Sequence, residues 1–436
     1  MGAGDPANSL SGPTRRGVSR GELMNVEIAF PKYDAQYRTF VTWRPVEVKL
    51  KLVQPPPGAA SVAVTVTART TVTGGRLAFA RTLVPRGAAS LSLTLPANGT
   101  PVSVWVGGQF PSASQQYGDV TMEVRATGTS QLLGAQPLMV RVRKNAERLS
   151  PQERDRFVAA MASLNGDVTG RFRAFREMHF DGAPDIEAHG GPGFLPWHRA
   201  YLLDLERELQ RIDAQVTLPY WRFDQPAPNL INRAFIGVPD AGDQVRFNAG
   251  HPLLNWVASN ALGIQRGGAI GPQSVAIVRT EAQTLRLAGT QNPDFATFAA
   301  MQRNPHDPAH SSHRRGWITR IGTAPQDPLF FLLHCNVDRL WAKWQFTFGR
   351  HDPNDSRCYP NPGPTRPGHR LNDALWPWCG PLSEPRPITA PGGALADSPM
   401  TMVPGPSPRL RDMIDYLGTV GPNHQAFAYD DVAFLN

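Results

Sequence analysis

Residues 327–345 have the sequence DPLFFLLHCNVDRLWAKWQ, which predicts a buried helix built around a single histidine. Asp327 is expected to cap this helix, and Pro328 fits its first turn, where a missing N–H group costs nothing. The residues at helical spacing form one buried stripe, which consists of Phe330, His334, Asp338 and Trp341. An unpaired buried imidazole nitrogen costs about 1–3 kcal/mol, so His334 requires a partner. Alone, it would be interpreted as a hydrogen-bonded core histidine.

Six of the eleven histidines fall into two groups of three. The first group is His179, His189 and His198, and the second is His306, His310 and His334. Three neutral imidazoles with few carboxylates nearby suit zinc, copper, iron or nickel and disfavour magnesium and calcium. The affinity order favours copper over zinc, but spacing alone does not choose between them. We interpret the other five as ordinary solvated residues, namely His251, His313, His351, His369 and His424.

Helical patterns run through the region that holds the first group. A capping box, SPQE, opens a helix at Ser150 that continues to about Leu164, and TGRFRAFREMHF follows with His179 at its buried end. A third helix begins near Leu195. Its predicted inner face is His198, Leu202, Leu205, Leu209 and Ile212, and its predicted outer residues are Glu206, Arg207, Glu208 and Arg211.

The second group starts with His306 and His310, which lie one helical turn apart in NPHDPAHSSHRR. Pro308 between them is acceptable only in the first turn of a helix, so both imidazoles are expected at a helix start and on one side. The helix around His334 completes this group. Two groups on four predicted helices favour two metals that face each other inside a four-helix bundle.

Residues 23–144 show a period-two pattern that is broken by Gly, Pro and Asn turns. The candidate strands are LMNVEIAF, FVTWRPVEVKLKLV, ASVAVTVTART, GRLAFARTLV, ASLSLTLPA, PVSVWVGGQF, DVTMEVRAT and PLMVRVRK. Eight short strands at this spacing favour an antiparallel β sandwich or barrel.

The chain is therefore predicted to be a multidomain α+β protein. We expect a disordered leader over residues 1–21, a β sandwich or barrel over residues 22–145, and a mainly α-helical domain with Pro-rich C-terminal loops over residues 146–436. Weaker patterns predict short helices near Leu254 and Ala296, a last helix in RLRDMIDYLG, and an edge strand in NHQAFAYDDVAFLN.

Composition limits the partners and the compartment. The net charge of +8 is spread along the chain without a basic helix, so nucleic acid is not an expected partner. No apolar run approaches the roughly 18 residues of a membrane helix, so no membrane is expected either. The pair Arg15 and Arg16 precedes no apolar segment, which argues against a signal peptide and favours the cytoplasm. Three cysteines exclude a disulfide scaffold, and the sequence leaves open whether Cys358 and Cys379 pair.

Two segments resemble the copper motifs of the tyrosinase and polyphenol oxidase family, which are type 3 copper proteins. The first is EAHGGPGFLPWHRAYLLDLE, and the second is HDPAH followed by DPLFFLLHCNVDRLW, which matches the family signature D-P-x-F and H-x3-D-R-x-W. The resemblance runs over about residues 143–348 and is similar to bacterial members, with fragments at LNDALWPW and RLRDMIDYLG. It does not cover the N-terminal strands, although some relatives carry a β domain beside the catalytic one.

The resemblance implies a dinuclear centre of two copper ions, with each group of three histidines on one copper. It implies O2 and a small phenolic or catecholic compound as reactants, with o-diphenols oxidised to o-quinones and monophenols left open. The candidates for substrate contact or for the general base are Asp307, Gln302, Ser311 and Ile321. Asp338 is a candidate for orienting a ligand imidazole. The β domain or a tail aromatic such as Tyr429 is expected to shield the copper edge.

The sequence departs from the family pattern at several positions. Asp307 stands where many monophenol-hydroxylating members have asparagine, and a carboxylate usually found a few residues earlier is replaced near Gln302. These changes weaken the case for monophenols, although Asp307 is itself a candidate base. No cysteine precedes His189 by two residues, so the thioether crosslink of fungal, plant and molluscan members is absent. Leu333 replaces a second histidine that many bacterial members have, and Arg222 replaces a commoner aspartate.

Three functions stay open at this point. The first is a phenol oxidase, and the second is a haemocyanin-like protein that binds O2 reversibly at the same kind of site. The third is a noncatalytic binding module in the strand-rich half. For Phe330 and Ile321, plain packing is the alternative to a place at the substrate mouth. The oligomeric state and the natural phenol are not determined by the sequence.

Overall fold

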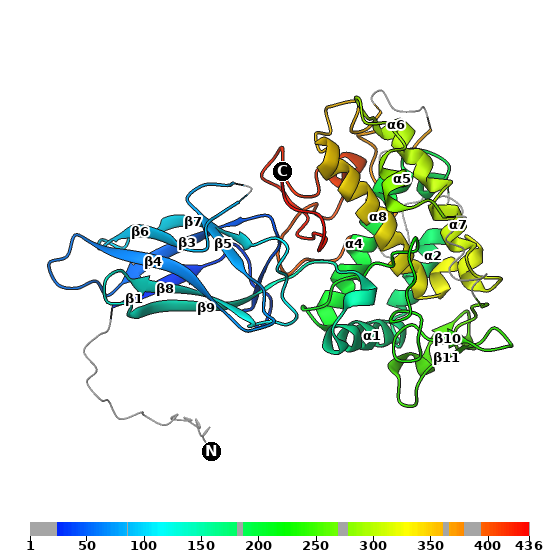
Figure 1. The fold of residues 1–436 in the computed structure, drawn as a ribbon, viewed down its shortest axis with the longest axis horizontal. Helices are drawn as coiled ribbons and strands as arrows, with labels where there is room; N and C mark the ends of the chain where they lie inside the picture. Colours follow the sequence, from blue (N-terminus) through cyan, green and yellow to red (C-terminus); the bar gives the residue numbers. More distant parts are fainter. Residues whose placement is uncertain are drawn as a thin grey trace, which may run out of the picture.

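The computed structural model describes residues 24–84, 86–180, 186–268, 278–360, 366–378 and 394–435. The N-terminal part forms a β-rich lobe and the following part a helical lobe, with the C-terminal segment between them (Figure 1). Strands extend to Val140 and the first helical turn begins at Ala146, so the predicted order of strands before helices is confirmed. The predicted leader and Cys379 lie outside the described residues.

The described part of the β-rich lobe contains two sheets. The strands are β1 (Asn25–Ala29), β2 (Thr39–Val41), β3 (Val46–Val53), β4 (Ser61–Thr70), β5 (Leu77–Ala80), β6 (Leu91–Pro96), β7 (Val102–Gly108), β8 (Val120–Ala126) and β9 (Leu132–Val140). One sheet has the order β1-β3-β7-β5 and the other has the order β2-β9-β8-β4-β6. Each predicted segment overlaps an observed strand. The second segment splits into β2 and β3 around Pro45, which has no N–H to donate to a neighbouring strand.

Alternating side chains build the core of this lobe. In β3, every second residue from Val46 to Leu52 is buried and the residues between them are exposed. Inward residues of both sheets, including Val64 of β4 and Val104 of β7, belong to one hydrophobic cluster. The pairings within both sheets are antiparallel except that of β2 with β9, which is parallel. A parallel pair needs a long crossover, and the chain from β3 to β8 supplies it.

The helical lobe holds the longest helices and several single turns. The α-helices are α1 (Pro151–Asn165), α2 (Arg171–Phe180), α4 (Phe194–Ile212), α5 (Glu281–Leu285), α6 (Phe295–Phe298), α7 (His306–His310) and α8 (Leu329–Phe348). The 3-10 turns are η1 (Ala146–Arg148), η2 (Pro252–Asn255), η3 (Ala299–Gln302), η4 (Trp317–Thr319), η5 (Ala324–Gln326) and η6 (Leu410–Met413). Two short hairpins are β10 (Val238–Pro239) with β11 (Val245–Arg246), and β12 (Val257–Ala258) with β13 (Ala261–Leu262).

Local signals explain where the main helices begin. Ser150 Oγ accepts a hydrogen bond from the Glu153 N–H at 3.3 Å, and the Glu153 carboxylate accepts from the Ser150 N–H at 3.0 Å, so the predicted capping box is confirmed. At α8, Asp327 Oδ1 accepts from the Leu329 N–H at 3.0 Å. The buried Arg266 guanidinium holds this carboxylate at 2.6 Å, which compensates its burial.

Helix α4 is buried on more sides than its sequence predicts. The expected outer residues Glu206 and Arg207 are buried, whereas Ile212, expected inside, is 44% exposed. Glu206 accepts from the Arg143 guanidinium at 2.9 Å, and Arg207 Nη1 donates to the Ala396 carbonyl at 3.1 Å. The prediction was wrong because segments distant in sequence cover the face that an isolated amphipathic helix leaves to water.

The C-terminal elements are shorter than predicted. RLRDMIDYLG forms only the turn η6, because Gln345 Nε2 donates to the Ile414 carbonyl at 2.8 Å and takes an acceptor that a longer helix would use. The predicted edge strand is reduced to isolated bridges of Tyr429 with Arg143 and Val432. The weak patterns near Leu254 and Ala296 appear as the single turns η2 and α6.

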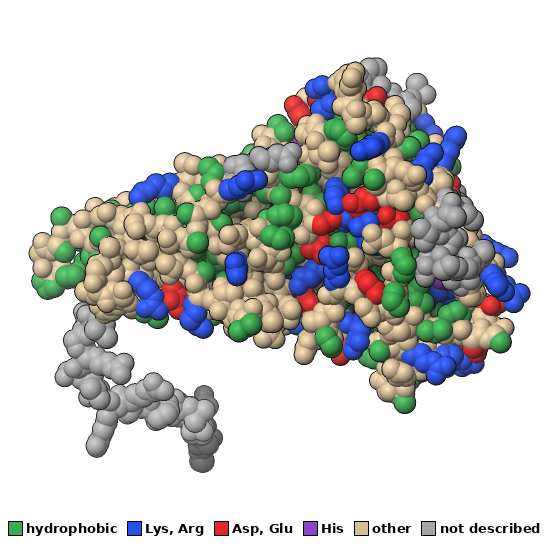
Figure 2. Space-filling view, in the orientation of Figure 1, with side chains coloured by type: hydrophobic (Ala, Val, Ile, Leu, Met, Phe, Trp, Pro, Cys, Tyr) green, Lys and Arg blue, Asp and Glu red, His purple; other side chains and the backbone are tan. Residues whose placement is uncertain are grey.

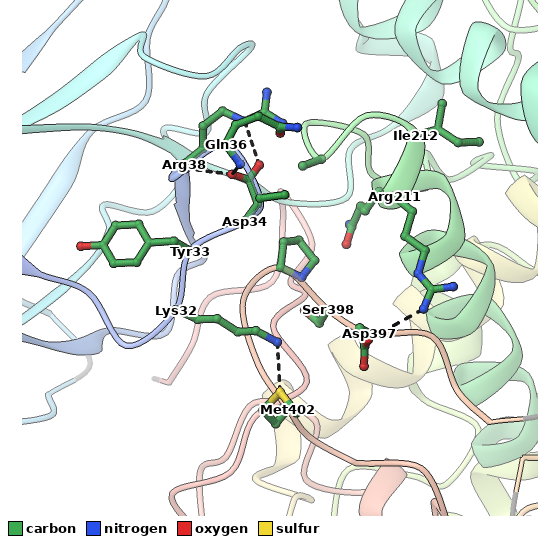
Figure 3. Close-up of a pocket in the computed structure, with 14 residues that line it drawn as sticks. Lys32, Tyr33, Asp34, Gln36, Arg38, Arg211, Ile212, Asp397, Ser398 and Met402 are labelled. Carbon is green, nitrogen blue, oxygen red and sulfur yellow. Dashed lines mark hydrogen bonds and ion pairs between the residues drawn. The ribbon is translucent and has the colours of Figure 1, made fainter. Parts of the chain in front are cut away.

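The two lobes meet across a polar junction. The β1–β2 connection faces the C-terminal end of α4 and residues 397–402 across a cavity of about 490 Å³ (Figure 3). Here the Arg38 guanidinium pairs with Asp34 at 2.8 Å, and Lys32 Nζ donates to the Thr401 carbonyl at 3.4 Å. None of the six grouped histidines lines this cavity.

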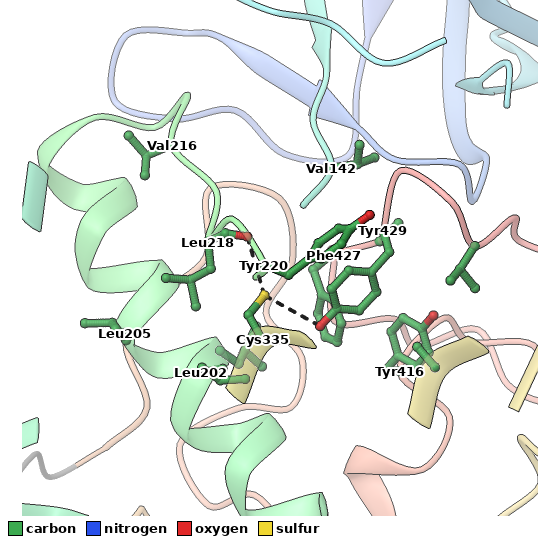
Figure 4. Close-up of a cluster of buried hydrophobic side chains, with 14 of the residues drawn as sticks. Val142, Leu202, Leu205, Val216, Leu218, Tyr220, Cys335, Tyr416, Phe427 and Tyr429 are labelled. Atoms are coloured by element: carbon green, nitrogen blue, oxygen red, sulfur yellow. Dashed lines mark hydrogen bonds between the residues drawn. The ribbon is translucent and has the colours of Figure 1, made fainter. Parts of the chain in front are cut away.

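The C-terminal segment packs between the β lobe and α8 (Figure 4). The Trp43 indole of the β lobe donates to the Tyr429 carbonyl at 2.7 Å, and the Tyr429 side chain is fully buried. Cys335 of α8 lies between the Tyr429 hydroxyl, 3.9 Å from its sulfur, and the Leu218 carbonyl, at 3.5 Å. This segment therefore ties the β lobe to the central helix.

The molecular surface differs between the lobes. On the face in Figure 2, Lys and Arg side chains are more frequent on the helical lobe than on the β lobe. Of the helices in the described ranges, none has both the length and the apolar character that crossing a membrane demands.

Candidate metal centre

Four helices and one loop bring the six grouped histidines together. They are His179 on α2, His189 in the loop before α4, His198 on α4, His306 and His310 at the two ends of α7, and His334 on α8. Within each group of three, one ring nitrogen from each histidine lies within 4.8 Å of the other two. The first three are called cluster A below, and the last three cluster B.

Cluster B converges through its Nε2 atoms. His310 Nε2 lies 3.0 Å from His306 Nε2 and 3.1 Å from His334 Nε2, and the latter two are 3.4 Å apart. Nitrogens that each lie about 2 Å from one metal in a tetrahedral or trigonal arrangement are roughly 3.3–3.5 Å apart. The three distances lie within about 0.3 Å of this range, so a small outward movement of the rings accommodates a metal ion between the nitrogens.

Clusters A and B share a wall. The rings of His198 and His334 stack with centroids 4.3 Å apart and planes inclined by 10°. The His179 ring centroid lies 6.3 Å from that of His334. Within cluster A, the ring centroids are 4.8–5.5 Å apart. Metal ions held by A and B would consequently be neighbours.

Backbone carbonyls select the tautomer of three rings. The Nδ1 atoms of His198, His306 and His310 lie 2.9, 3.1 and 2.8 Å from carbonyl oxygens, which belong to Phe194, Gln302 and Ile318. A carbonyl only accepts, so each Nδ1 carries the hydrogen and donates. Each Nε2 is left with a lone pair, the form that a metal requires.

Burial keeps the clustered imidazoles neutral. Desolvation, followed by the neighbouring imidazoles, lowers the pKa well below 6.5 for His179, His198, His310 and His334. Both ring nitrogens of His179, Nε2 of His198 and Nδ1 of His334 are buried without a hydrogen bond of ordinary geometry. A neutral imidazole keeps one lone pair, so His179 and Nε2 of His198 offer buried lone pairs without partners. A donor set of nitrogens alone fits copper or zinc and not magnesium or calcium.

Two phenylalanines wall the centre. The Phe330 ring, fully buried, lies 4.3 Å from the ring of His334 and 4.9 Å from that of His179. The Phe194 ring lies 4.6 Å from the His198 ring and 4.9 Å from the His306 ring. Each therefore contacts both clusters and excludes water from them. Phe194 was not predicted from the sequence, where its signal is its position one turn before His198.

His369 braces the loop that carries His189. It is 1% exposed, so its interpretation as solvated was wrong. Its Nδ1 accepts from the Gly193 N–H at 3.0 Å, and its Nε2 donates to the Ile186 carbonyl at 3.0 Å. A Cβ at Gly191 would lie 2.6 Å from this ring, so only glycine fits there. The glycine-rich loop was the only sequence signal for this packing.

Two further histidines are also buried, contrary to the prediction. His313 and His351 are 3% and 6% exposed. Burial lowers the pKa of each to about 4. His313 packs near Trp221, with ring centroids 6.1 Å apart, and belongs to neither cluster. Neighbours distant in sequence cover both rings.

Asp338 does not orient an imidazole, so that prediction was wrong. Its Oδ1 accepts from Arg199 Nε at 2.6 Å. Its Oδ2 accepts from Arg143 Nη1 at 3.1 Å and from the Tyr429 hydroxyl at 2.5 Å. The Tyr429 hydroxyl is thus bound to Asp338 of α8 and not to the metal centre. The prediction that Tyr429 shields the copper edge was therefore also wrong. The contacts between the lobes described above include none of the six grouped histidines.

The orienting carboxylate is Asp307 instead. Its Oδ1 lies 2.8 Å from His306 Nδ1, which donates to it. The Asp307 side chain is 60% exposed, so this pair faces solvent on one side. The acid follows its partner directly in sequence, whereas the Asp338 interpretation relied on helical spacing alone.

A cavity of about 460 Å³ is lined by residues that adjoin one histidine of each cluster in sequence, although no clustered histidine lines it. It is lined by Gly190, which follows His189, and by Asp307, which follows His306. Gln302 and Arg303 also line it, and Ser311 is exposed beside His310. Ile321 is 56% exposed, and its carbonyl opposes the lowering of the pKa of His179. The predicted substrate-contacting residues therefore lie around the centre, and Ile321 is not plain core packing.

The part of the chain that matches known proteins contains all six grouped histidines. Residues 169–347 match the common central domain of tyrosinase. The tyrosinase of Streptomyces antibioticus is 32% identical over 269 residues, which cover 54% of this chain and 92% of that protein. Hemocyanin 2 of Megathura crenulata is 28% identical over 258 residues, which cover 54% of this chain and 7% of that protein.

A functional unit of octopus haemocyanin, among solved structures, has 19% identity and a TM-score of 0.45, covering 67% of this chain and 69% of that one. The family assignment rests on the sequence match to the Streptomyces enzyme, which is nearly complete. The chain belongs to the tyrosinase family of dicopper phenol oxidases.

Proposed function

We propose that this protein uses O2 to oxidise o-diphenols to o-quinones at two copper ions. Under this proposal, cluster A holds one copper and cluster B the other. The observation that carries it is the convergence of three Nε2 atoms at 3.0–3.4 Å beside the stacked rings of His198 and His334. When bound, the two coppers supply one electron each to O2 and accept electrons from the phenol.

The chain itself positions and shields the reactants. Carbonyl-bound Nδ1 atoms keep three ligand lone pairs directed inward. Phe194 and Phe330 exclude water from the space between the clusters. The cavity beside Asp307 and Gly190, about 460 Å³, has the size of a small-molecule pocket and gives a phenol a route to the centre.

The finer architecture is part of the proposal. We propose that α2, α4, α7 and α8 act as a four-helix bundle around the metals, supported by the stacked rings that α4 and α8 contribute. We propose that the two N-terminal sheets form a sandwich, supported by their shared hydrophobic cluster. The division into residues 22–145 and 146–436 belongs to the same proposal.

Whether monophenols are also substrates depends on the base near the second copper. Asp307 is the candidate, and its Oδ1 already accepts from His306 Nδ1 at 2.8 Å. A carboxylate oxygen that already accepts from a ligand imidazole is less available to accept the proton of a phenol. We therefore propose diphenols as the main substrates, with hydroxylation of monophenols slower.

The test is a paired assay on copper-loaded protein with 4-methylcatechol and 4-methylphenol, followed by quinone absorbance and copper analysis. The expected result is about two coppers per chain, rapid oxidation of the catechol and slow oxidation of the phenol. Copper far below two per chain, together with catechol oxidation unaffected by His198→Ala, contradicts the proposal.

The alternative is a haemocyanin-like function, which the match to Hemocyanin 2 favours. It requires the same histidines and differs in access to the metals. Reversible O2 uptake without quinone from any small catechol would replace the oxidase proposal. The open cavity at Asp307 argues for access.

A further inference from the structure

A second cavity, of about 620 Å³, lies beside α2 and the segment before α8. Its charged lining residues are Arg173, Arg176, Glu177 and Arg320. The lining therefore carries a net charge of +2, three arginines against one glutamate. It is separate from the cavity at Asp307, with which it shares no lining residue.

Among the described residues, one of these guanidinium groups forms an ion pair. Arg173 pairs with Glu177 at 3.5 Å along α2. Arg176 makes a single long contact with Ser259 Oγ at 3.4 Å, and its Nε is buried without a partner. Throughout the described ranges, the exposed Arg320 side chain makes no hydrogen bond or ion pair. Two cations thus face the cavity with unused donors, the arrangement that a carboxylate satisfies.

Two of the arginines that line this cavity lie close in the chain to residues at the metal centre. Arg176 lies one helical turn before His179 on α2. Arg320 directly precedes Ile321, whose side chain is 56% exposed and whose carbonyl acts on the His179 ring. The ring substituent of a phenol held at cluster A would have to extend past Ile321 to reach these two arginines.

We propose that Arg176 and Arg320 bind the anionic substituent of a carboxylated catechol, so that acidic catechols are the preferred substrate class. This inference rests on the proposed phenol oxidation. The two arginines are specificity residues that contact the substituent and not the reacting hydroxyl groups. The effect is expected in KM and not in kcat, because the ion pair is made equally in ground and transition states.

The test compares 3-(3,4-dihydroxyphenyl)propionate with its amide, which has the same shape without the charge. On copper-loaded protein at low salt, the acid is expected to have a KM about fivefold lower than the amide. Arg320→Gln is expected to remove this difference while kcat and the KM of the amide stay unchanged. Added salt is also expected to reduce the difference in KM between the acid and the amide, because it screens the ion pair.

Arg286→Gln is the matched control, because it removes one exposed arginine that does not line the cavity. It is expected to keep the preference for the acid. Arg176→Gln is the second variant if Arg320→Gln does not fold. Equal KM values for acid and amide in the unmodified protein, or an equal response of both to Arg320→Gln, overturn the inference.

Calorimetry separates this inference from the proposed function. 3-Phenylpropionate and its amide lack hydroxyl groups and are not oxidised, so their binding to the copper-loaded chain needs no activity. Tighter binding of the acid that depends on Arg320, without oxidation of any catechol, supports the site and contradicts the oxidase. Oxidation of both catechols without discrimination contradicts the site and supports the oxidase.

Discussion

Helices α4 and α8 carry two buried polar clusters next to each other, and they are satisfied in opposite ways. His198 and His334 face each other in the metal centre, with Nε2 of His198 and Nδ1 of His334 unpaired. The adjoining residue Arg199 and the residue one turn on, Asp338, form a buried ion pair at 2.6 Å. The histidine cluster therefore has buried nitrogens that no group in the described part of the chain satisfies, whereas the charges of Arg199 and Asp338 neutralise each other.

The ion network is completed from outside the two helices. Arg143, which follows β9, pairs with Glu206 at 2.9 Å and with Asp338 at 3.1 Å. The Arg199 guanidinium also lies 3.6 Å from the centroid of the Trp341 ring. Two arginines balance two carboxylates, so this network stabilises the helix pair without metal. The comparison teaches that folding and metal binding depend on different residues of the same helices.

The largest effect that tests this comparison is the removal of a ligand. His334→Ala is expected to reduce copper from about two to about one ion per chain, because two nitrogens hold a metal poorly, and to reduce catechol oxidation by at least about 100-fold. Copper analysis and the quinone assay measure this. Leu340→Ala, a buried position on the same helix, is the control and should retain both coppers.

Breaking the ion network should affect folding first. Asp338→Ala leaves the buried Arg199 without its carboxylate and Arg143 with Glu206 alone, and it is expected to lower the free energy of unfolding of the metal-free protein by about 3–5 kcal/mol. Urea unfolding measures it. The double variant Arg199→Met with Asp338→Leu removes both charges and should be milder. A double variant less stable than the single one would show that the network contributes more than charge balance.

Acid should weaken the fold through histidines outside the metal centre. Burial lowers the pKa of His313 and His351 to about 4, below the unfolded value of about 6.5. A depressed folded pKa contributes stability above pH 6.5, and that stability is lost as the pH falls towards 4, by about 3 kcal/mol per histidine. Unfolding of the metal-free protein between pH 7 and 4 measures the loss. His351→Gln should flatten the slope, and an unchanged slope would exclude His351 as a cause.

The smallest expected effect concerns Asp307. Asp307→Asn keeps an oxygen that accepts from His306 Nδ1 but removes the charge that strengthens this bond. Copper affinity is expected to fall about tenfold, the lower end for such orienting partners. Titration with a competing chelator measures it, with Ser311→Ala as the neutral control. A change in unfolding free energy without a change in copper affinity would show that Asp307 stabilises the fold and does not support metal binding.

Local sequence patterns predicted much of the fold. Alternation gave the strands, and the SPQE box gave the start of α1, because both depend on residues that are close in the chain. The six histidines were found for a similar reason, since residue type and helical spacing suffice to propose a ligand. The same reasoning failed for Glu206, Arg207 and His369, whose burial depends on segments up to about 200 residues away, such as Ala396 and Ile186.

By itself, the sequence determined that six imidazoles stand on helices and on one glycine-rich loop, in two groups of three. Only the tertiary structure decided that three Nε2 atoms meet at 3.0–3.4 Å and that the His198 and His334 rings stack at 4.3 Å. It also decided that Asp338 serves Arg199 and not an imidazole. Periodicity fixes the face of a helix on which a side chain lies, whereas the partner on that face depends on which distant segment packs there.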